Sequence, residues 1–141
     1  MSWLDDQIEE KRNFDERRAK IDADAVTLSD DLWVALCKIA AEAGQKGFTL
    51  NPNVTETKRS IGFGAVNMLG HRRMDFALTR DKPNVTASWG GDSIRFEIDI
   101  CNDGTVCLNW KGVPVSIDRA AHQIMRSFLF PELPKRASDS T

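Results

Sequence analysis

The sequence is poor in the residue types and patterns that most often reveal a function. It has three cysteines and two histidines, and its longest apolar run, residues 32–37, is far too short to span a membrane. Its first six residues, Met-Ser-Trp-Leu-Asp-Asp, have neither the basic start nor the apolar segment of a secretory signal. An odd number of cysteines favours free thiols in a reducing compartment. We therefore expect a cytoplasmic protein that does not bind a membrane.

Motifs for catalysis and metal binding are equally scarce. Metal sites need clustered ligands, whereas the histidines and cysteines are widely spaced. Cys101 and Cys107 flank a predicted turn, but Asp99 is expected opposite Cys107, so a disulfide would need a different register and both cysteines are interpreted as isolated thiols. No Gly-x-Ser-x-Gly nucleophile motif and no Gly-x-x-x-x-Gly-Lys phosphate loop occurs. The sequence thus predicts no catalytic residue, no metal site and no cofactor, and it favours a protein that is not an enzyme.

Charge is unevenly distributed along the chain. The net charge is −2, yet residues 1–31 hold ten acidic and five basic residues, and the remainder holds eleven acidic and fourteen basic residues. Proteins that bind nucleic acid depend on clustered positive charge, which is missing because acids interleave with the bases. This pattern argues against a nucleic-acid partner.

Helical periodicity predicts two helices in the N-terminal third of the chain. The first, over residues 2–20, has Ser2 as a candidate N-cap and acids in its first turn. The second begins with a capping sequence at Thr27, and its apolar residues recur at three- and four-residue steps until Gly44 and Gly47 end it. The first helix is mostly charged, with a thin apolar stripe made by Leu4, Ile8, Phe14 and Ile21.

Between residues 48 and 115 the apolar period changes to two, which predicts antiparallel strands. The expected strands lie within residues 56–68, 74–78, 85–89, 94–100 and 106–110. The Asn102-Asp103-Gly104 sequence suits a three-residue hairpin loop that pairs Ile98 with Leu108. A four-residue loop over residues 90–93 would place Trp89 opposite Ile94 and Ala87 opposite Phe96.

A last helix is expected to begin at Ser116 or Asp118 and to end before Pro131. The predicted fold class is therefore α+β: two N-terminal helices, a four- to five-stranded antiparallel meander and a C-terminal helix, with the second and third helices on one face of the sheet. We predict a charged N-terminal helical segment over residues 1–25, a single domain over 26–134 and a disordered tail over 135–141.

Two surfaces are candidates for binding. His71, Arg72 and Arg73 follow a glycine and could hold a phosphate or carboxylate, although the same residues also suit an ordinary polar turn between strands. The second candidate is the N-terminal segment, whose spaced apolar side chains either pack on the body, pair with a second copy or insert into the groove of a partner. These side chains are Trp3, Leu4, Ile8 and Phe14.

The leading hypothesis is a non-enzymatic protein-interaction or assembly module that uses its N-terminal helix, with a second copy or another protein as partner. The alternative is a small-ligand or anion-binding protein, conceivably an enzyme, with a cleft between the sheet and the helices and with residues 71–73 near its rim.

Overall fold

The N-terminal third of the chain forms a single long helix, α1 (Trp3–Gln45), in a computed structural model that describes residues 2–55, 58–63, 72–79 and 81–131. Ser2 is its N-cap, because the Ser2 hydroxyl accepts a hydrogen bond from the backbone N–H of Asp5 at 3.2 Å. The helix ends where the backbone N–H of Phe48 bonds to the carbonyl of Ala43 at 3.0 Å and Gly47 adopts a φ of 98°.

The prediction of two separate N-terminal helices was wrong, because α1 runs through the expected break without interruption. Thr27 and its neighbours resemble a capping sequence, but no glycine or proline lies there to stop the helix. Ser29 is 3% exposed and lies on the buried face of α1. The continuous ladder of backbone hydrogen bonds therefore prevails over the local capping signal.

The sheet contains seven antiparallel strands within the described residues, each paired with its neighbours in the sequence. They are β1 (Leu50–Val54), β2 (Arg59–Phe63), β3 (Arg72–Thr79), β4 (Asn84–Trp89), β5 (Asp92–Ile100), β6 (Val106–Trp110) and β7 (Val113–Val115). The meander topology is confirmed, but the expected number of four or five strands was wrong. The two additional strands form the edges of the sheet, and each has a proline near its centre, Pro52 and Pro114.

One predicted hairpin register is confirmed and one is corrected. Ile98 pairs with Leu108, and Gly104 at the loop adopts a φ of 85°. In the preceding hairpin, however, Trp89 pairs with Asp92, so the loop has two residues rather than four. Those two residues, Gly90 and Gly91, both have positive φ, as the tight turns that match the twist of a hairpin require.

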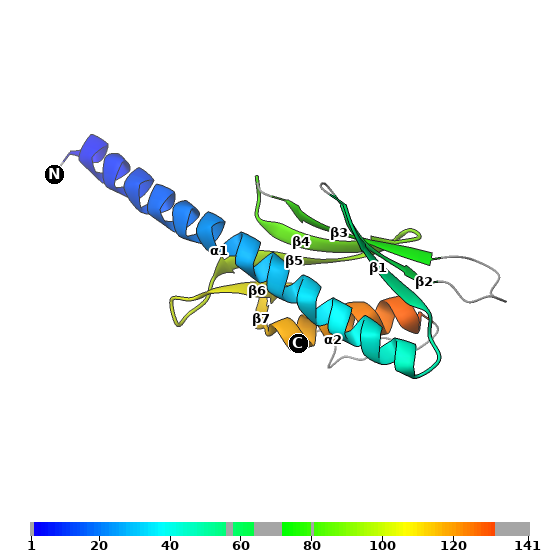
Figure 1. Cartoon of the computed structure of the whole chain (residues 1–141). Coiled ribbons are helices and arrows are strands. Elements are labelled where there is room, and N and C mark those ends of the chain that lie inside the picture. Colours follow the sequence, from blue (N-terminus) through cyan, green and yellow to red (C-terminus); the bar gives the residue numbers. More distant parts are fainter. Residues whose placement is uncertain (1, 56–57, 64–71, 80, 132–141) are drawn as a thin grey trace.

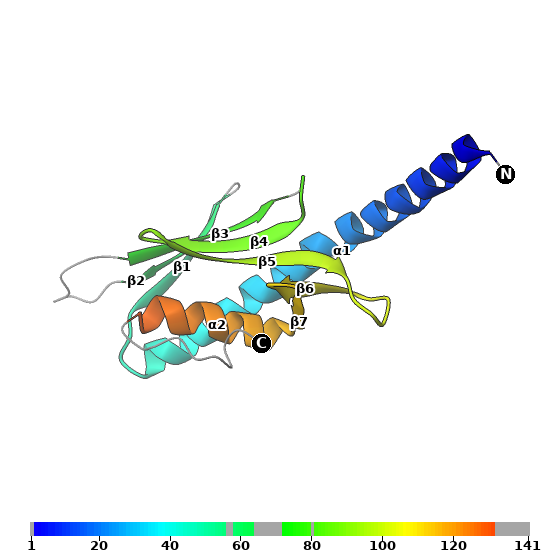
Figure 2. The same cartoon turned by 180° about the vertical axis from the view of Figure 1, so that it is seen from behind.

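Both helices pack on the same face of the curved sheet, as Figures 1 and 2 show from opposite sides. The C-terminal helix, α2 (Ile117–Leu129), is capped by the Ser116 hydroxyl, which accepts from the backbone N–H of Arg119 at 3.1 Å. Aromatic rings join the layers: the ring centroid of Trp33 in α1 is 5.6 Å from that of Phe76, and the ring of Phe128 in α2 is 5.8 Å from that of Trp89. The core therefore lies between one sheet face and two helices.

Candidate functional site

The first fourteen residues of α1, residues 3–16, extend beyond the body and are called the arm below (Figure 1). Every residue from Ser2 to Arg17 is exposed, and Ile21 is the first buried side chain along the described part of the chain. At 1.5 Å per residue the arm is about 21 Å long. An isolated helix of this length is marginal in water, but the arm continues a helix whose inner turns are already fixed by packing.

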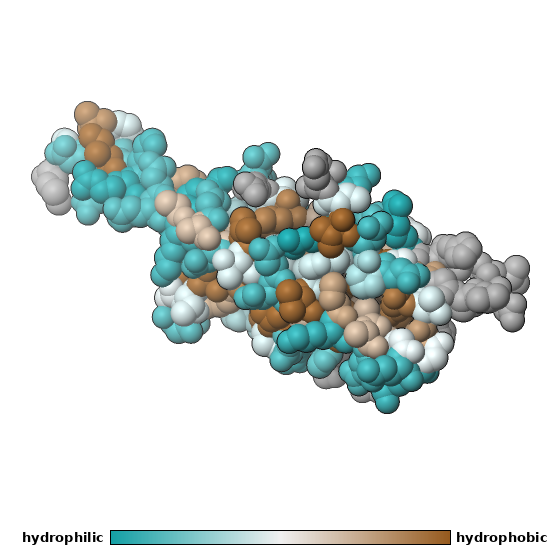
Figure 3. All heavy atoms as spheres, viewed as in Figure 1, coloured by the Kyte–Doolittle hydropathy of each residue, from teal (hydrophilic) through white to brown (hydrophobic). Residues whose placement is uncertain are grey.

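Four large apolar side chains of the arm are exposed to solvent, although each is of a type that is normally buried. Figure 3 shows hydrophobic residues at the surface near the tip of the arm, beside hydrophilic ones. Leu4 and Ile8 are one helical turn apart, and Phe14 precedes the buried Ile21 by seven residues, so it shares the face on which α1 packs against the body. The exposed fractions are 75% for Trp3, 58% for Leu4, 50% for Ile8 and 61% for Phe14. The apolar stripe of α1 thus continues past the point where the body stops covering it.

Three basic side chains hold α1 where the arm leaves the body, and we call their contacts the collar. An Arg17 guanidinium nitrogen lies 2.6 Å from a carboxylate oxygen of Asp99. Arg18 donates to the carbonyl of Asp81 at 2.5 Å, and Lys20 donates to the carbonyl of Gly104 at 2.5 Å. Asp99 lies in β5, Asp81 lies between β3 and β4, and Gly104 lies between β5 and β6, so the collar ties α1 to three places on the sheet and its loops.

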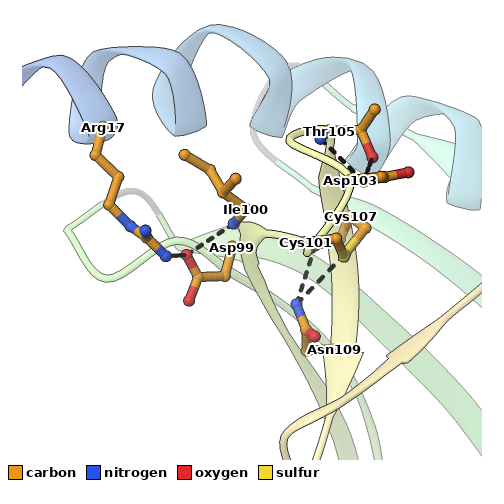
Figure 4. The surroundings of a disulfide bond; sticks show 8 residues. All are labelled: Arg17, Asp99, Ile100, Cys101, Asp103, Thr105, Cys107 and Asn109. Atoms are coloured by element: carbon orange, nitrogen blue, oxygen red, sulfur yellow. Dashed lines mark hydrogen bonds and ion pairs between the residues drawn. A yellow bond between two sulfur atoms is a disulfide. The ribbon is translucent and has the colours of Figure 1, made fainter.

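The Asp99 carboxylate has two roles at the collar (Figure 4). One of its oxygens accepts from the backbone N–H of Ile100 at 2.7 Å and from Arg17. Partial burial raises the pKa of Asp99, but these hydrogen bonds and the positive charge of Arg17 lower it by more, so the net shift is downward. The ion pair is therefore formed throughout the neutral range.

A disulfide between Cys101 and Cys107 closes the hairpin loop beside the collar (Figure 4). The interpretation of both as isolated thiols was wrong, even though the predicted register, with Asp99 opposite Cys107, is correct. Diagonal neighbours across two strands are usually about 7–8 Å apart. Here the two Cα atoms are 6.1 Å apart, within the range that a disulfide spans, because Cys101 lies beyond the last ladder pair, where the hairpin twists.

A groove of 470 Å³ lies between α1 and α2. Val34, Ile39 and Ile117 give it apolar walls, and Lys38 and His122 also line it. The sequence analysis placed a cleft elsewhere, between the sheet and the helices. The sequence of neither helix shows which of its sides faces the other helix, so the sequence holds no signal for this groove. Its other lining residues are Asp31, Ala35, Asp118 and Ala121.

The described residues do not test the predicted anion site at residues 71–73. His71 lies outside the described residues, and only the backbone of Arg72, at the start of β3, is described. Arg73 is exposed, and its Nε lies 3.2 Å from a carboxylate oxygen of Asp75 in the same strand. That anion site stays a prediction.

The remaining groups do not form a reactive centre among the described residues. No group of three or more His, Cys, Asp or Glu side chains there could hold a metal ion. Burial raises the pKa of the free Cys37 thiol, and the nearby Arg59 offsets this only in part, so Cys37 is protonated at neutral pH and is a poor nucleophile. No described helix has the length and apolar character needed to cross a membrane.

Comparison with protein families, curated proteins and solved structures finds no match to this chain. The arm, the collar and the groove are therefore the features from which a function has to be inferred.

Proposed function

We propose that this protein is an assembly module whose body holds the arm in a fixed direction so that its apolar stripe docks on another polypeptide. The observation that carries the proposal is the exposure of Trp3, Leu4, Ile8 and Phe14 on the arm, which leaves large apolar side chains in water with no cover from the body. A helix with apolar residues at such spacing is a common recognition element for grooves and for other helices.

The collar supports this proposal because it makes the arm rigid before any partner arrives. Contacts of Arg17 with β5, and of Arg18 and Lys20 with two loops, restrict how α1 can bend where it leaves the sheet. A pre-ordered helix loses less conformational entropy on binding than a flexible one, so more of the burial of its apolar side chains contributes to affinity.

Removal of the arm tests the proposal. Because Ile21 and Ala25 are buried in the body, the truncation should remove residues 1–16 only and leave the collar in place. We would compare the whole chain, the truncated chain and Phe14→Asp by light scattering, and would measure which proteins each tagged chain retains from cells of its own source. We expect self-association or a specific partner to be lost in both altered chains. If masses and retained proteins are the same for all three chains, the proposal is wrong.

A second candidate function is the binding of a small, partly apolar molecule in the groove between α1 and α2. The volume of 470 Å³ is within the range of small-molecule sites, and Lys38 is a positively charged residue among those that line it. A thermal-shift screen tests it, since a ligand present at a hundred times its Kd stabilises the folded state by about 2.7 kcal/mol. A matched Lys38→Glu and Val34→Asp pair should lose any such shift, and the absence of a hit across a broad panel would count against this function.

A further inference from the structure

The disulfide between Cys101 and Cys107 closes the tip of the hairpin between β5 and β6, and one contact of the collar is made to that tip. Lys20 donates to the carbonyl of Gly104, which lies inside the loop that the two cysteines close. Hydrogen bonds within the same loop lower the pKa of Asp103, and the positive charge of Lys20 adds to this shift. Both observations place the Lys20 ammonium group at the tip of the hairpin, which lies close to α1 in Figure 4.

Two backbone hydrogen bonds also shape this tip. The N–H of Cys101 donates to the carbonyl of Thr105 at 2.7 Å, and the N–H of Gly104 donates to the carbonyl of Cys101 at 2.9 Å. Residues 102–105 are all exposed, so these bonds compete with water, and exposed ends of this kind open locally at a low cost in free energy. The disulfide joins the two strands at the base of the loop and therefore limits how far Gly104 can move when these bonds open.

The disulfide is open to thiol–disulfide exchange, because both cysteines are only half-buried. One thiolate of a dithiol attacks a sulfur of the pair, which breaks the S–S bond and forms a mixed disulfide. The second thiol of the reductant then attacks that mixed disulfide and leaves with the first as an oxidised disulfide. Two electrons and two protons pass to the protein, which then carries two thiols, and the reverse reaction restores the bond. Cys37 is not an internal reactant, since it lies about 25 Å from Lys20 along α1.

We infer, on the basis of the proposed function, that Cys101 and Cys107 form a redox-sensitive site through which a dithiol controls how firmly the collar holds the arm. While the disulfide is intact, the carbonyl of Gly104 stays in place beside Lys20, and α1 is held where it leaves the sheet. When the cysteines are reduced, the tip opens more often, the Lys20 contact is made less often, and the adjoining turns of α1 unravel more readily. A looser arm loses more conformational entropy on binding, so reduction weakens its docking on a partner.

Amide hydrogen exchange of the whole chain, measured by mass spectrometry with and without dithiothreitol, tests this inference. Residues 17–24 of α1 report on the collar, because opening of the helix there breaks the collar contacts. Reduction should make their exchange about two- to tenfold faster, the range that loss of one hydrogen bond allows. Residues 32–43 of α1 pack in the core and exchange through global unfolding, which reduction also makes more frequent, so they report that the bond has been cut.

Two substitutions separate the effect of the collar from the general stability of the fold. Lys20→Met removes the contact with the hairpin tip, so residues 17–24 should exchange at the faster rate in both redox states, while residues 32–43 still respond to dithiothreitol. Lys11→Met is the matched control, because it makes the same change on the arm, where Lys11 pairs with a carboxylate of its own helix. This control should keep the full response of residues 17–24.

Replacement of Cys101 and Cys107 by serine should reproduce the reduced state and abolish any response to dithiothreitol. If residues 17–24 of the unaltered chain exchange at the same rate in both states although residues 32–43 respond, the disulfide does not control the collar and the inference is overturned. It is also overturned if Lys20→Met keeps the response of residues 17–24, or if alkylation shows that dithiothreitol leaves the bond of the folded chain intact. These measurements involve no partner, so any of these failures leaves the proposed function to be decided by the truncated chain.

Discussion

Two apolar residues of α1 should respond differently to replacement by alanine: one change should lower the stability of the fold, and the other should weaken association. Leu36 of α1 is fully buried in the core, whereas Phe14 on the arm is 61% exposed. Leu36→Ala removes buried methyl groups and leaves a cavity, which lowers the free energy of unfolding by about 2–5 kcal/mol. Phe14→Ala leaves no cavity, so the change should stay within about 0.5 kcal/mol.

The assay is urea unfolding followed by tryptophan fluorescence, at a protein concentration at which the chain is monomeric. Association should show the reverse order: Phe14→Ala should weaken it, and Leu36→Ala should leave it unchanged as long as the protein is folded. Alanine also favours the helix over phenylalanine by up to about 0.7 kcal/mol, so a loss of arm helicity would not explain weaker association. If Phe14→Ala destabilises the monomer by more than about 1 kcal/mol, the arm packs on the body in solution and the reasoning fails.

Three further sets of substitutions test the disulfide, the collar and the conformation of two glycines. Replacing Cys101 and Cys107 by serine should lower the free energy of unfolding by about 2 kcal/mol, since the disulfide closes a short loop. A reductant should lower the stability of the unaltered chain by the same amount and leave the variant unchanged. If the unaltered chain does not respond to reductant, the two cysteines are not joined by a disulfide. The pKa of Asp99 in the folded protein is below its unfolded value, so its ion pair stabilises the protein above about pH 4, and that stabilisation is lost as the pH falls through the folded pKa. Asp99→Asn should therefore be less stable than the unaltered chain by under about 1 kcal/mol at neutral pH and equally stable at acid pH. A stability difference that stays constant across a pH series of urea unfolding would contradict this. Gly91→Ala should destabilise the protein by about 1 kcal/mol, because the φ of Gly91 is 100°. Gly44 lies in a helix with open space around it, so Gly44→Ala should stabilise the protein by about 0.5–1 kcal/mol. If the melting temperatures of both variants shift in the same direction, the argument is refuted.

The fold class could be predicted from the sequence because the periods of its apolar residues are strong. The two-residue period from residue 74 to residue 110 locates β3 to β6, and the Asn-Asp-Gly sequence places their last hairpin in the correct register. The number of strands could not be predicted, because β1 and β7 lie at the edges of the sheet, are largely exposed and contain proline. Neither strand shows the alternation that a half-buried strand requires.

The candidate site was predictable only in part. Periodicity identified the apolar residues of the N-terminal segment, but whether the body covers them depends on where the sheet ends, which no local pattern encodes. The prediction of two helices missed that α1 is continuous and that its first turns extend beyond the body, since a break near Thr27 would have allowed the first helix to fold back. The collar depends on three contacts that bridge more than sixty residues each, between α1 and either β5 or a distant loop, and such contacts appear only in the folded chain.

The prolines of the two edge strands have a consequence for aggregation. An open sheet offers unpaired backbone groups along its first and last strands, where a strand of another molecule can add and start a fibril. Pro52 stands in the middle of the five residues of β1, and Pro114 in the middle of the three residues of β7. Proline has no backbone N–H to offer, so an incoming strand would find a missing bond at the centre of either edge. The two prolines therefore disfavour stacking of this protein through the edges of its sheet in a crowded solution.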